Sequence, residues 1–494
     1  MIIKMPAKYF VLPVICSLIS GSNAQTRVFD KVIAKDGSGD YISVGTAISM
    51  YSNSRKVFFI KNGIYREKIL VSSQKTDIRL IGESTDGVII TYDDYAGKSG
   101  TSSSTADSYT LRVEGDGFYA ENITFQNSAT QAQAVAVYAR ADTIVFKNCR
   151  FLGYQDTHYA DNGRQFYLNC ETRGDVDFIF GDAAVLYESS TIISRSRKPG
   201  YITAPSEAVL KSPKSGGGTN YHGILIKNSR LLAEEGLSDN SCYLGRPWGP
   251  YAASVFFNCN TGSHIKPEGW SVWSDDPASE GYNNHLSAFF AEYNSTDLQG
   301  NPLDVSGRVA WSNQLTDEDT SFYSIDNYFL GWNPIPKVTP LDPPGDVLIS
   351  GDSLKWDAVQ GARGYVILRN DSAVDFSVDP ACYIGGKTGQ IYKIKSVNPI
   401  GALSIPSNTA TLTFIPRIDN NLHSDYEIYI NTGILYVPEN EKIELFDLAG
   451  NKIKIMIGCR CFPVEDLEPG IYIIKVVLDK SGTTITQKIL NLSL

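Results

Sequence analysis

At 494 residues the chain is too long for one ordinary domain, and we expect two or three. Hydrophobic residues make up 42% and charged residues 20%, a composition that is typical of folded soluble proteins and excludes a disordered or membrane-embedded chain. The formal net charge is −10 and no cluster of lysines or arginines offsets it, so we expect no nucleic-acid partner.

The N-terminus predicts a secretory signal at residues 1–24. Lys4 and Lys8 precede an apolar run at residues 9–19. Residues 22–24 then match the small residues of a cleavage site. A membrane anchor is disfavoured because the run is too short to cross a bilayer. The mature chain is expected to begin near Gln25, with a charge of roughly −12 once the two lysines are removed. The predicted location is therefore extracytoplasmic: the periplasm, the outer-membrane surface or the medium.

Residues 25–337 are predicted to form a stacked β architecture. Short β-type segments there are broken by glycine, asparagine and aspartate, without long helical periodicity. Short segments of similar sequence recur, as expected of successive coils of a solenoid. They begin at Asn122, Asn148, Asn169, Ser189, Asn228 and Asn258. A β-sandwich is the alternative, but its turns come closer together than these echoes.

Closely spaced prolines between residues 334 and 344 predict a linker. Residues 338–416, including 364–369 and 398–401, then resemble a fibronectin type III module. Such a module is expected to act as a spacer or a binding support rather than as a catalyst.

Residues 421–494 alternate apolar and polar positions and predict a small antiparallel β-sandwich. The phrases at 443–450 and 469–476 resemble C-terminal sorting domains of Bacteroidetes proteins exported by the type IX route. That resemblance implies export machinery as a partner, and a purely structural β-sandwich is the alternative. The whole chain is thus predicted to be all-β: a parallel β-helix followed by two small β-sandwich modules.

Two aspartates lie one repeat apart, Asp156 in the turn at 153–157 and Asp177 in the turn at 174–181. If each repeat is one solenoid coil, residues at matching phases lie about 4.8 Å apart. Like charges at that distance push the two pKa values apart, leaving one carboxylate nucleophile or base and one protonated acid.

Several ordered motifs, taken together, resemble pectin methylesterases over the first two thirds of the chain. They are residues 36–41, 115–125, 133–136, the two aspartate turns and 244–248. The resemblance implies a right-handed parallel β-helix that hydrolyses the C6 methyl ester of galacturonate in pectin and releases methanol, without a metal or other cofactor. Methyl-esterified pectin is then the expected partner, and the protein is expected to be a monomer.

Ester hydrolysis needs a nucleophile, donors for the oxyanion and an acid for the leaving alkoxide. By resemblance Asp177 is the nucleophile that forms a covalent anhydride, and Asp156 is the acid that later becomes the base. Gln133 and Gln155 would stabilise the oxyanion. Arg246 would orient Asp177 and keep it ionised through charge-assisted hydrogen bonds.

Four further residues are predicted to contact the substrate: Trp248, Phe178, Thr105 and Tyr154. Trp248 and Phe178 offer flat faces to a sugar ring. His158 is interpreted as a variation in the groove wall. Each residue also has a structural interpretation, such as a turn-forming aspartate or a glutamine ladder inside the solenoid, and the joint pattern favours function.

Seven cysteines remain after the signal is removed, an odd number that excludes full internal pairing. Cys149 and Cys170 occupy echoing positions where they would stack or pair, and a disulfide between Cys242 and Cys259 is a second hypothesis. The resemblance implies a further cysteine one coil after the nucleophile, but Ser190 stands there.

Two other functions stay open from the sequence. A β-helix depolymerase of polygalacturonate would also use two carboxylates about 5 Å apart. It is disfavoured by the two glutamines and the arginine–tryptophan motif, which suit acyl transfer. A non-catalytic carbohydrate-binding solenoid would be favoured by loss of Asp156, Asp177 or Arg246, all of which are present.

Overall fold

The structure is a computed structural model, and it describes residues 27–51, 55–214, 218–350, 353–384 and 390–411 together with the strands between 429 and 491. The predicted signal at 1–24 lies outside the described residues, as does part of the segment at 421–494. In the described part of the chain, no helix has the length and apolar character needed to cross a membrane. The chain divides into two compact units, the first made of Met1–Leu348, Leu354–Cys382 and Lys393–Asn408 and the second of Ile349–Ser353, Tyr383–Tyr392 and Thr409–Leu494.

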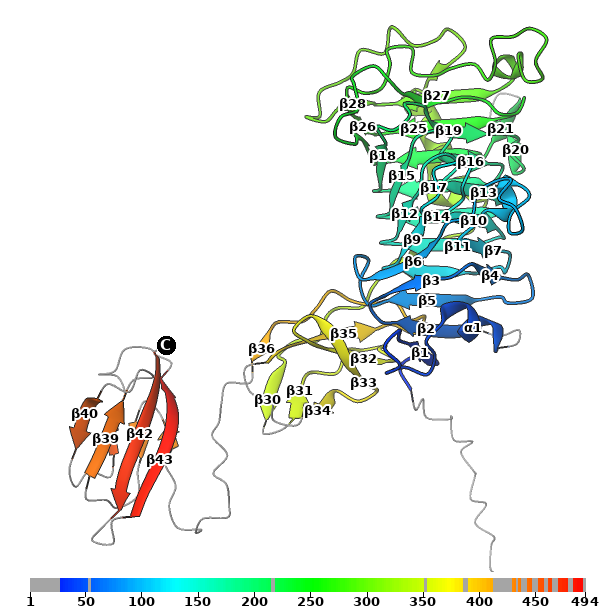
Figure 1. Cartoon of the computed structure of the whole chain (residues 1–494). Helices are drawn as coiled ribbons and strands as arrows, with labels where there is room; N and C mark the ends of the chain where they lie inside the picture. The colour runs from blue at the N-terminus through cyan, green and yellow to red at the C-terminus, as the bar shows by residue number, and fades with distance from the viewer. Residues whose placement is uncertain are drawn as a thin grey trace, which may run out of the picture. The chain divides into compact units, whose positions relative to one another are not determined.

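Three long parallel sheets build the first unit, and the chain passes through them in turn to complete each coil (Figure 1). The eleven-stranded sheet has the order β1 (Lys31–Ile33), β2 (Lys56–Ile60), β5 (Ile78–Gly82), β8 (Tyr119–Glu121), β11 (Ile144–Lys147), β14 (Arg164–Leu168), β17 (Ala184–Glu188), β22 (Ile224–Lys227), β25 (Ala253–Phe257), β27 (Phe289–Tyr293) and β29 (Asn313–Gln314). The nine-stranded sheet has the order β28 (Thr296–Asp297), β26 (Asn260–Thr261), β23 (Arg230–Ala233), β18 (Thr191–Ser194), β15 (Glu171–Gly174), β12 (Arg150–Leu152), β9 (Thr124–Asn127), β6 (Val88–Tyr92) and β3 (Gly63–Arg66). The seven-stranded sheet has the order β24 (Tyr243–Gly245), β19 (Tyr201–Pro205), β16 (Ile179–Gly181), β13 (His158–Asn162), β10 (Val137–Arg140), β7 (Leu111–Val113) and β4 (Ile69–Val71).

This arrangement is a right-handed parallel β-helix, and the β-helix part of the predicted fold is confirmed. Short helices and one hairpin decorate the coils: α1 (Val44–Ser49), η1 (Thr105–Asp107), η2 (Asn284–Leu286), η3 (Asp317–Tyr323), α2 (Ile325–Tyr328), α3 (Ile335–Val338), β20 (Lys211–Pro213) and β21 (Thr219–Tyr221).

The echoing asparagines mark the same corner of successive coils. Asn122, Asn148 and Asn169 have left-handed backbones with φ of 58°, 52° and 51°, a conformation that asparagine tolerates. Their side chains form a ladder, since the Asn148 amide donates to Asn122 Oδ1 at 3.2 Å and the Asn169 amide to Asn148 Oδ1 at 2.7 Å. Ser189 interrupts this ladder on the next coil. The sequence echoes therefore mark successive coils, as predicted, and the structure places them at one corner of each coil.

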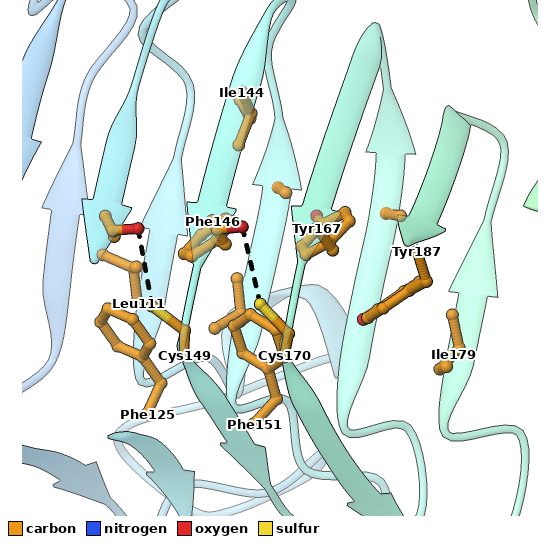
Figure 2. Packing of buried hydrophobic residues seen from close by; sticks show 14 of the residues in the cluster. Leu111, Phe125, Ile144, Phe146, Cys149, Phe151, Tyr167, Cys170, Ile179 and Tyr187 are labelled. Atoms are coloured by element: carbon orange, nitrogen blue, oxygen red, sulfur yellow. Dashed lines mark hydrogen bonds between the residues drawn. The ribbon is translucent and has the colours of Figure 1, made fainter. Parts of the chain in front are cut away.

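Stacked aromatic side chains fill the interior of the coils (Figure 2). The ring of Tyr167 lies 5.3 Å from that of Phe146 and 4.5 Å from that of Tyr187, with nearly parallel planes in both pairs. Cys149 and Cys170 are free thiols beside this stack, and their Sγ atoms contact backbone carbonyls rather than each other. Burial raises the pKa of the Cys170 thiol to about 12.

Cys242 and Cys259 are also buried free thiols, so the disulfide hypothesised between them is wrong in this structure. The thiol of Cys259 contacts the carbonyl oxygen of Ile226 at 3.3 Å instead. The parallel strands place these side chains inside the core, where they pack as small apolar groups.

The part of the segment at 338–416 that belongs to the first unit packs against the eleven-stranded sheet. The strands of the whole segment are β30 (Leu348–Ser350), β31 (Ser353–Lys355), β32 (Gly364–Arg369), β33 (Ser372–Ser377), β34 (Ala381–Tyr383), β35 (Ile391–Val397) and β36 (Ala410–Thr411). Val366 and Leu403 share a buried apolar cluster with Val57 and Phe59 of β2. Buried Arg79 donates from Nη1 to the Ile400 carbonyl at 3.1 Å. The fibronectin-like assignment of this segment remains a prediction.

The described strands of the segment at 421–494 pair in antiparallel fashion. They are β37 (Tyr429–Asn431), β38 (Ile434–Tyr436), β39 (Lys442–Phe446), β40 (Lys452–Met456), β41 (Cys461–Pro463), β42 (Gly470–Leu478) and β43 (Thr483–Asn491). The sorting-like role of this segment also remains a prediction.

Candidate active site

Two equivalent turns place Asp156 and Asp177 on adjacent coils. Each turn leads from the nine-stranded sheet to the seven-stranded sheet, between β12 and β13 for Asp156 and between β15 and β16 for Asp177. Both aspartates have left-handed backbones, with φ of 65° and 50°. Gly174 opens the second turn because a Cβ there would lie 2.1 Å from the Cβ of Phe178. The two turns are neighbours, since the Asp156 N–H donates to the Val176 carbonyl at 3.0 Å and His158 lies in register with Ile179. The two aspartates therefore lie side by side at about one coil spacing of 4.8 Å.

Arg246, which directly follows β24, donates two hydrogen bonds from its guanidinium to the Asp177 carboxylate. Its Nε donates to Oδ1 at 2.9 Å and its Nη2 to Oδ2 at 2.6 Å. The guanidinium also lies between two aromatic rings, with its Cζ 4.0 Å from the Tyr201 centroid and 4.3 Å from the Trp273 centroid. Because its plane is held on both faces, Arg246 has little freedom to release the carboxylate.

The two carboxyls have different electrostatic surroundings. Burial and the neighbouring charge of Asp177 raise the pKa of Asp156 well above its usual value. Burial also raises the pKa of Asp177, but the hydrogen bonds and the charge of Arg246 oppose this effect. Within the described residues the Asp156 carboxyl forms no hydrogen bond or ion pair. The pair can therefore hold one proton on Asp156 beside an ionised Asp177.

A cavity of about 490 Å³ opens above the two carboxyls. Its lining consists of Ser104, Thr105, Ala106, Gln133, Gln155, Asp156, Tyr159, Asp177, Phe180, Ala204, Arg246, Trp248 and Trp273. The predicted set of Asp156, Asp177, Gln133, Gln155 and Arg246 thus converges on one cavity. The backbone of Gln155 is tied to the coil that carries Gln133, since its carbonyl accepts from Ala134 N at 3.1 Å.

An aromatic ladder forms one side of this cavity. Tyr138, Tyr159 and Phe180 lie in register on β10, β13 and β16. Their ring centroids are 4.5 Å and 4.3 Å apart along the ladder, with nearly parallel planes. The Trp248 ring meets Phe180 edge-on at 6.1 Å and is 40% exposed. Two ladder rings and Trp248 line the cavity, where apolar faces suit the C–H face of a sugar ring.

One predicted substrate contact, Phe178, is wrong, and another, Tyr154, lies outside the cavity and remains a prediction. Phe178 is fully buried in the core, because the left-handed backbone of Asp177 breaks the strand alternation and turns Phe178 and Ile179 inward. Phe180 points outward in its place. Tyr154 does not line the cavity, since its ring is covered by Arg195 and Arg197, with Cζ-to-centroid distances of 4.3 Å and 4.7 Å. Thr105 and Trp248 do line the cavity.

His158 is not in the groove wall either. Its side chain is fully buried, and that burial lowers its pKa to about 3. The Tyr167 hydroxyl donates to Gln165 Oε1 at 2.7 Å, so it accepts from Nε2–H of His158 at 2.8 Å. The Tyr187 hydroxyl then donates to Nδ1 at 2.8 Å. Neutral His158 is therefore a fully bonded core residue behind the aspartate turn.

Sequence reasoning missed Tyr138, Tyr159, Phe180, Tyr201 and Trp273. The first three recur at 21-residue intervals, which is also the interval between Asp156 and Asp177. This shared 21-residue period could have been used to predict that the three rings stack on adjacent coils. Tyr201 and Trp273 carry no comparable pattern. In the part of the chain that the structure describes, no three histidine, cysteine or acidic side chains are grouped closely enough to hold a metal ion.

Comparison with known proteins places this geometry in context. A family model described as Pectinesterase matches residues 30–331. The chain is 36% identical over 293 residues to a probable pectinesterase/pectinesterase inhibitor of Brassica napus, which covers 57% of this chain and 47% of that protein. It is 34% identical over 316 residues to probable pectinesterase/pectinesterase inhibitor 6 of Arabidopsis thaliana, which covers 62% of this chain and 53% of that protein. The chain thus spans about half the length of the curated relatives that it matches.

Solved structures match the β-helix over nearly their whole length. Pectin methylesterase from carrot aligns with a TM-score of 0.55 and 33% identity, over 63% of this chain and 96% of that one. Pectin methylesterase PemA from Erwinia chrysanthemi aligns with a TM-score of 0.53 and 28% identity, over 62% of this chain and 98% of that one. A pectin methylesterase in complex with a hexasaccharide aligns with a TM-score of 0.52 and 27% identity, over 62% of this chain and 98% of that one.

Proposed function

Because the chain belongs to the pectinesterase family, we propose that it hydrolyses the C6 methyl esters of galacturonate in pectin and releases methanol. One observation carries the proposal: two buried carboxyls lie on adjacent coils, one gripped by Arg246 and the other without a hydrogen-bonding partner among the described residues. The similar solved structures named pectin methylesterases support this substrate class.

In the first step, a carboxylate oxygen of Asp177 attacks the ester carbonyl carbon. The two hydrogen bonds from Arg246 keep Asp177 ionised and aim it at the cavity. Negative charge then develops on the carbonyl oxygen, which the amide N–H groups of Gln133 and Gln155, two residues that line the cavity, would stabilise. The C–O bond to the methoxy group breaks as Asp156 donates its proton to that oxygen. Methanol leaves, and an anhydride joins Asp177 to the uronic acid.

In the second step, water resolves the anhydride. Asp156, now ionised, takes a proton from the attacking water, whose oxygen bonds to the acyl carbon. The bond to Asp177 breaks and its carboxylate returns to Arg246. Asp156 is again protonated, so the residue pair is ready for another ester. The ordering of the two pKa values supports this division of roles, because Asp156 binds a proton more tightly than Asp177.

The polysaccharide would rest on the aromatic rings that line the cavity. Trp248, which is 40% exposed, provides an apolar face beside the largely buried Phe180, and Thr105 also lines the cavity. Methyl-esterified pectin is neutral at its esters, which suits a protein of net charge −10.

The remaining parts of the chain would deliver this enzyme outside the cytoplasm. We propose a signal at 1–24, a catalytic β-helix at 25–337, a fibronectin-like spacer at 338–416 and a sorting-like domain at 421–494 that engages export machinery. We also propose that the enzyme acts as a monomer.

The test is methanol release from esterified pectin by the chain lacking residues 1–24, with uronide chain length followed in the same tube. Asp177→Ala should lower the rate at least about a thousandfold. Asp86→Ala is the matched control, since Asp86 is an exposed aspartate paired with Arg150 outside the cavity. Chain shortening without methanol would instead indicate a depolymerase, and neither product would favour a binding solenoid.

A further inference from the structure

Asp156 and Asp177 occupy equivalent positions on adjacent coils. On the three following coils, this position is occupied by two tyrosines and a lysine. Strand β16 pairs with β19 so that Ile179 faces Thr203, which brings Tyr201 to the coil position of Asp177. Tyr201 pairs with Tyr243 on β24. A bridge between Cys242 and Ile265 then brings Lys266 beside Tyr243 on the following coil.

Direct contacts join these side chains into one continuous surface. The Arg246 guanidinium that holds Asp177 also lies over the Tyr201 ring at 4.0 Å. The rings of Tyr201 and Tyr243 stack with centroids 5.4 Å apart and planes at 11°. The Lys266 Nζ lies 4.5 Å from the Tyr243 centroid and donates to its hydroxyl at 3.2 Å. The surface therefore runs from the nucleophile to an ammonium group.

The ammonium of Lys266 lacks a carboxylate partner among the described residues. This differs from Lys68 and Lys147, whose ammonium groups pair with Asp94 at 2.7 Å and Glu121 at 3.0 Å. The Lys266 backbone is fixed, since its N–H donates to the Cys242 carbonyl at 2.9 Å. A positioned, half-buried cation without a carboxylate leaves a place for an anionic group of a ligand.

We infer that Tyr201, Tyr243 and Lys266 form a subsite that binds a galacturonate residue whose carboxylate is free. Arg246, the neighbouring ring and Lys266 stack on the faces of the two tyrosine rings, so the ring edges would contact the sugar. The Lys266 ammonium pairs with the carboxylate. A methyl ester at the same place is uncharged and cannot form an ion pair with this ammonium group. The inference rests on the proposed function for its ligand class.

The subsite lies along the polysaccharide from the reacting ester rather than at it. Lys266 is separated from the Asp177 coil by the Tyr201 and Tyr243 coils, or roughly 10 to 15 Å at one coil spacing each. A pyranose residue has a length comparable to one coil spacing, so the carboxylate belongs to a sugar two or three residues from the ester. The enzyme therefore favours an ester with a free acid at that distance.

Binding of a fully de-esterified galacturonate hexamer, measured by calorimetry, tests the subsite without turnover. Lys266→Gln and Lys266→Met should each weaken binding about two- to fivefold, the effect of losing a partly exposed ion pair, and should flatten its salt dependence. Lys35→Gln is the matched control, because the Lys35 Nζ also lies over a tyrosine ring, 5.8 Å from the Tyr65 centroid, on the first coil. It should bind the hexamer as the unaltered protein does.

A kinetic comparison separates the subsite from the proposed activity. The kcat/KM of Lys266→Gln should fall more on partly esterified pectin than on fully esterified pectin. Equal hexamer binding by Lys266→Gln and the unaltered protein would overturn the inference, as would an equal loss of kcat/KM on both pectins. If the unaltered protein releases no methanol while Lys266→Gln still loses hexamer affinity, the subsite stands and the proposed esterase activity falls.

Discussion

Arg246 donates two hydrogen bonds to Asp177, from Nε at 2.9 Å and from Nη2 at 2.6 Å, although 69 residues separate them in the chain. The same guanidinium is stacked between Tyr201 and Trp273. The carboxylate proposed as nucleophile is thus positioned by a group that is itself held rigidly.

Replacing this guanidinium by an ammonium should be costly. Arg246→Lys keeps a positive charge but loses the paired hydrogen bonds and the planar stacking, so kcat should fall about 10- to 100-fold through misplacement of Asp177. Arg164→Lys is a matched control, since Arg164 grips Asp142 through Nε at 2.9 Å and Nη2 at 2.5 Å and lies 5.6 Å from the Trp332 ring, outside the cavity. Initial rates of methanol release at saturating pectin measure both, and equal losses would contradict a specific role for Arg246.

The pH dependence of the reaction should be bell-shaped. The acidic limb reports ionisation of Asp177, and the alkaline limb reports loss of the proton from Asp156, whose pKa is raised by burial and by Asp177. Asp156→Asn should lower kcat by about 10² to 10⁴ and remove the alkaline limb, since no proton is left to lose. Rate profiles between pH 4 and pH 10 test this, and a rate that climbs steadily into alkaline pH would contradict the assignment of Asp156.

The proton on Asp156 also has a consequence for stability. A carboxyl whose pKa is raised by folding stabilises the protein below its unfolded pKa, and this contribution is lost as pH rises through the folded pKa. Asp156→Asn removes that loss, so at pH 8 the free energy of unfolding should rise by on the order of 1 kcal/mol or more. At pH 4 the difference should nearly vanish. Denaturant unfolding at the two pH values measures it, and an equal effect at both would indicate a cause other than ionisation.

The contribution of buried His158 to the free energy of unfolding should have the opposite pH dependence. Its pKa is lowered from 6.5 to about 3, so its neutral form contributes stability above pH 6.5 that is lost as pH falls toward 3. His158→Phe should remove this dependence while costing about 1 to 3 kcal/mol at pH 7, because the Tyr167 and Tyr187 hydroxyls lose a partner. Unfolding measurements from pH 7 to pH 3.5 compare the slopes. His285, which is partly buried and lies outside the core stack, provides the control in His285→Phe.

The sequence predicted the repeat, and with it the pairing of the two aspartates. A 21-residue interval between Asp156 and Asp177 equals one coil, so the parallel fold brings the two turns side by side without further information. The recurring asparagines could also be assigned to successive coils from the sequence, because one corner of each coil adopts a left-handed backbone that asparagine tolerates.

The direction in which side chains point could not be predicted from the motif alone. Phe178 and Phe180 are two residues apart and would share a face in a regular strand. The left-handed turn at Asp177 breaks this alternation, so Phe178 lies in the core and Phe180 lines the cavity. The same break follows Asp156, since Thr157 is fully buried and Tyr159 lines the cavity.

The sequence by itself therefore determined the coil repeat, the residue types of the site and the adjacency of its two carboxyls, because these depend on a local period. Only the tertiary structure decided that Tyr201 and Trp273 enclose Arg246 and that Tyr154 is covered by Arg195 and Arg197. Those contacts join coils and loops whose lengths follow no repeat. Their positions depend on how the connecting segments pack, which no local period specifies.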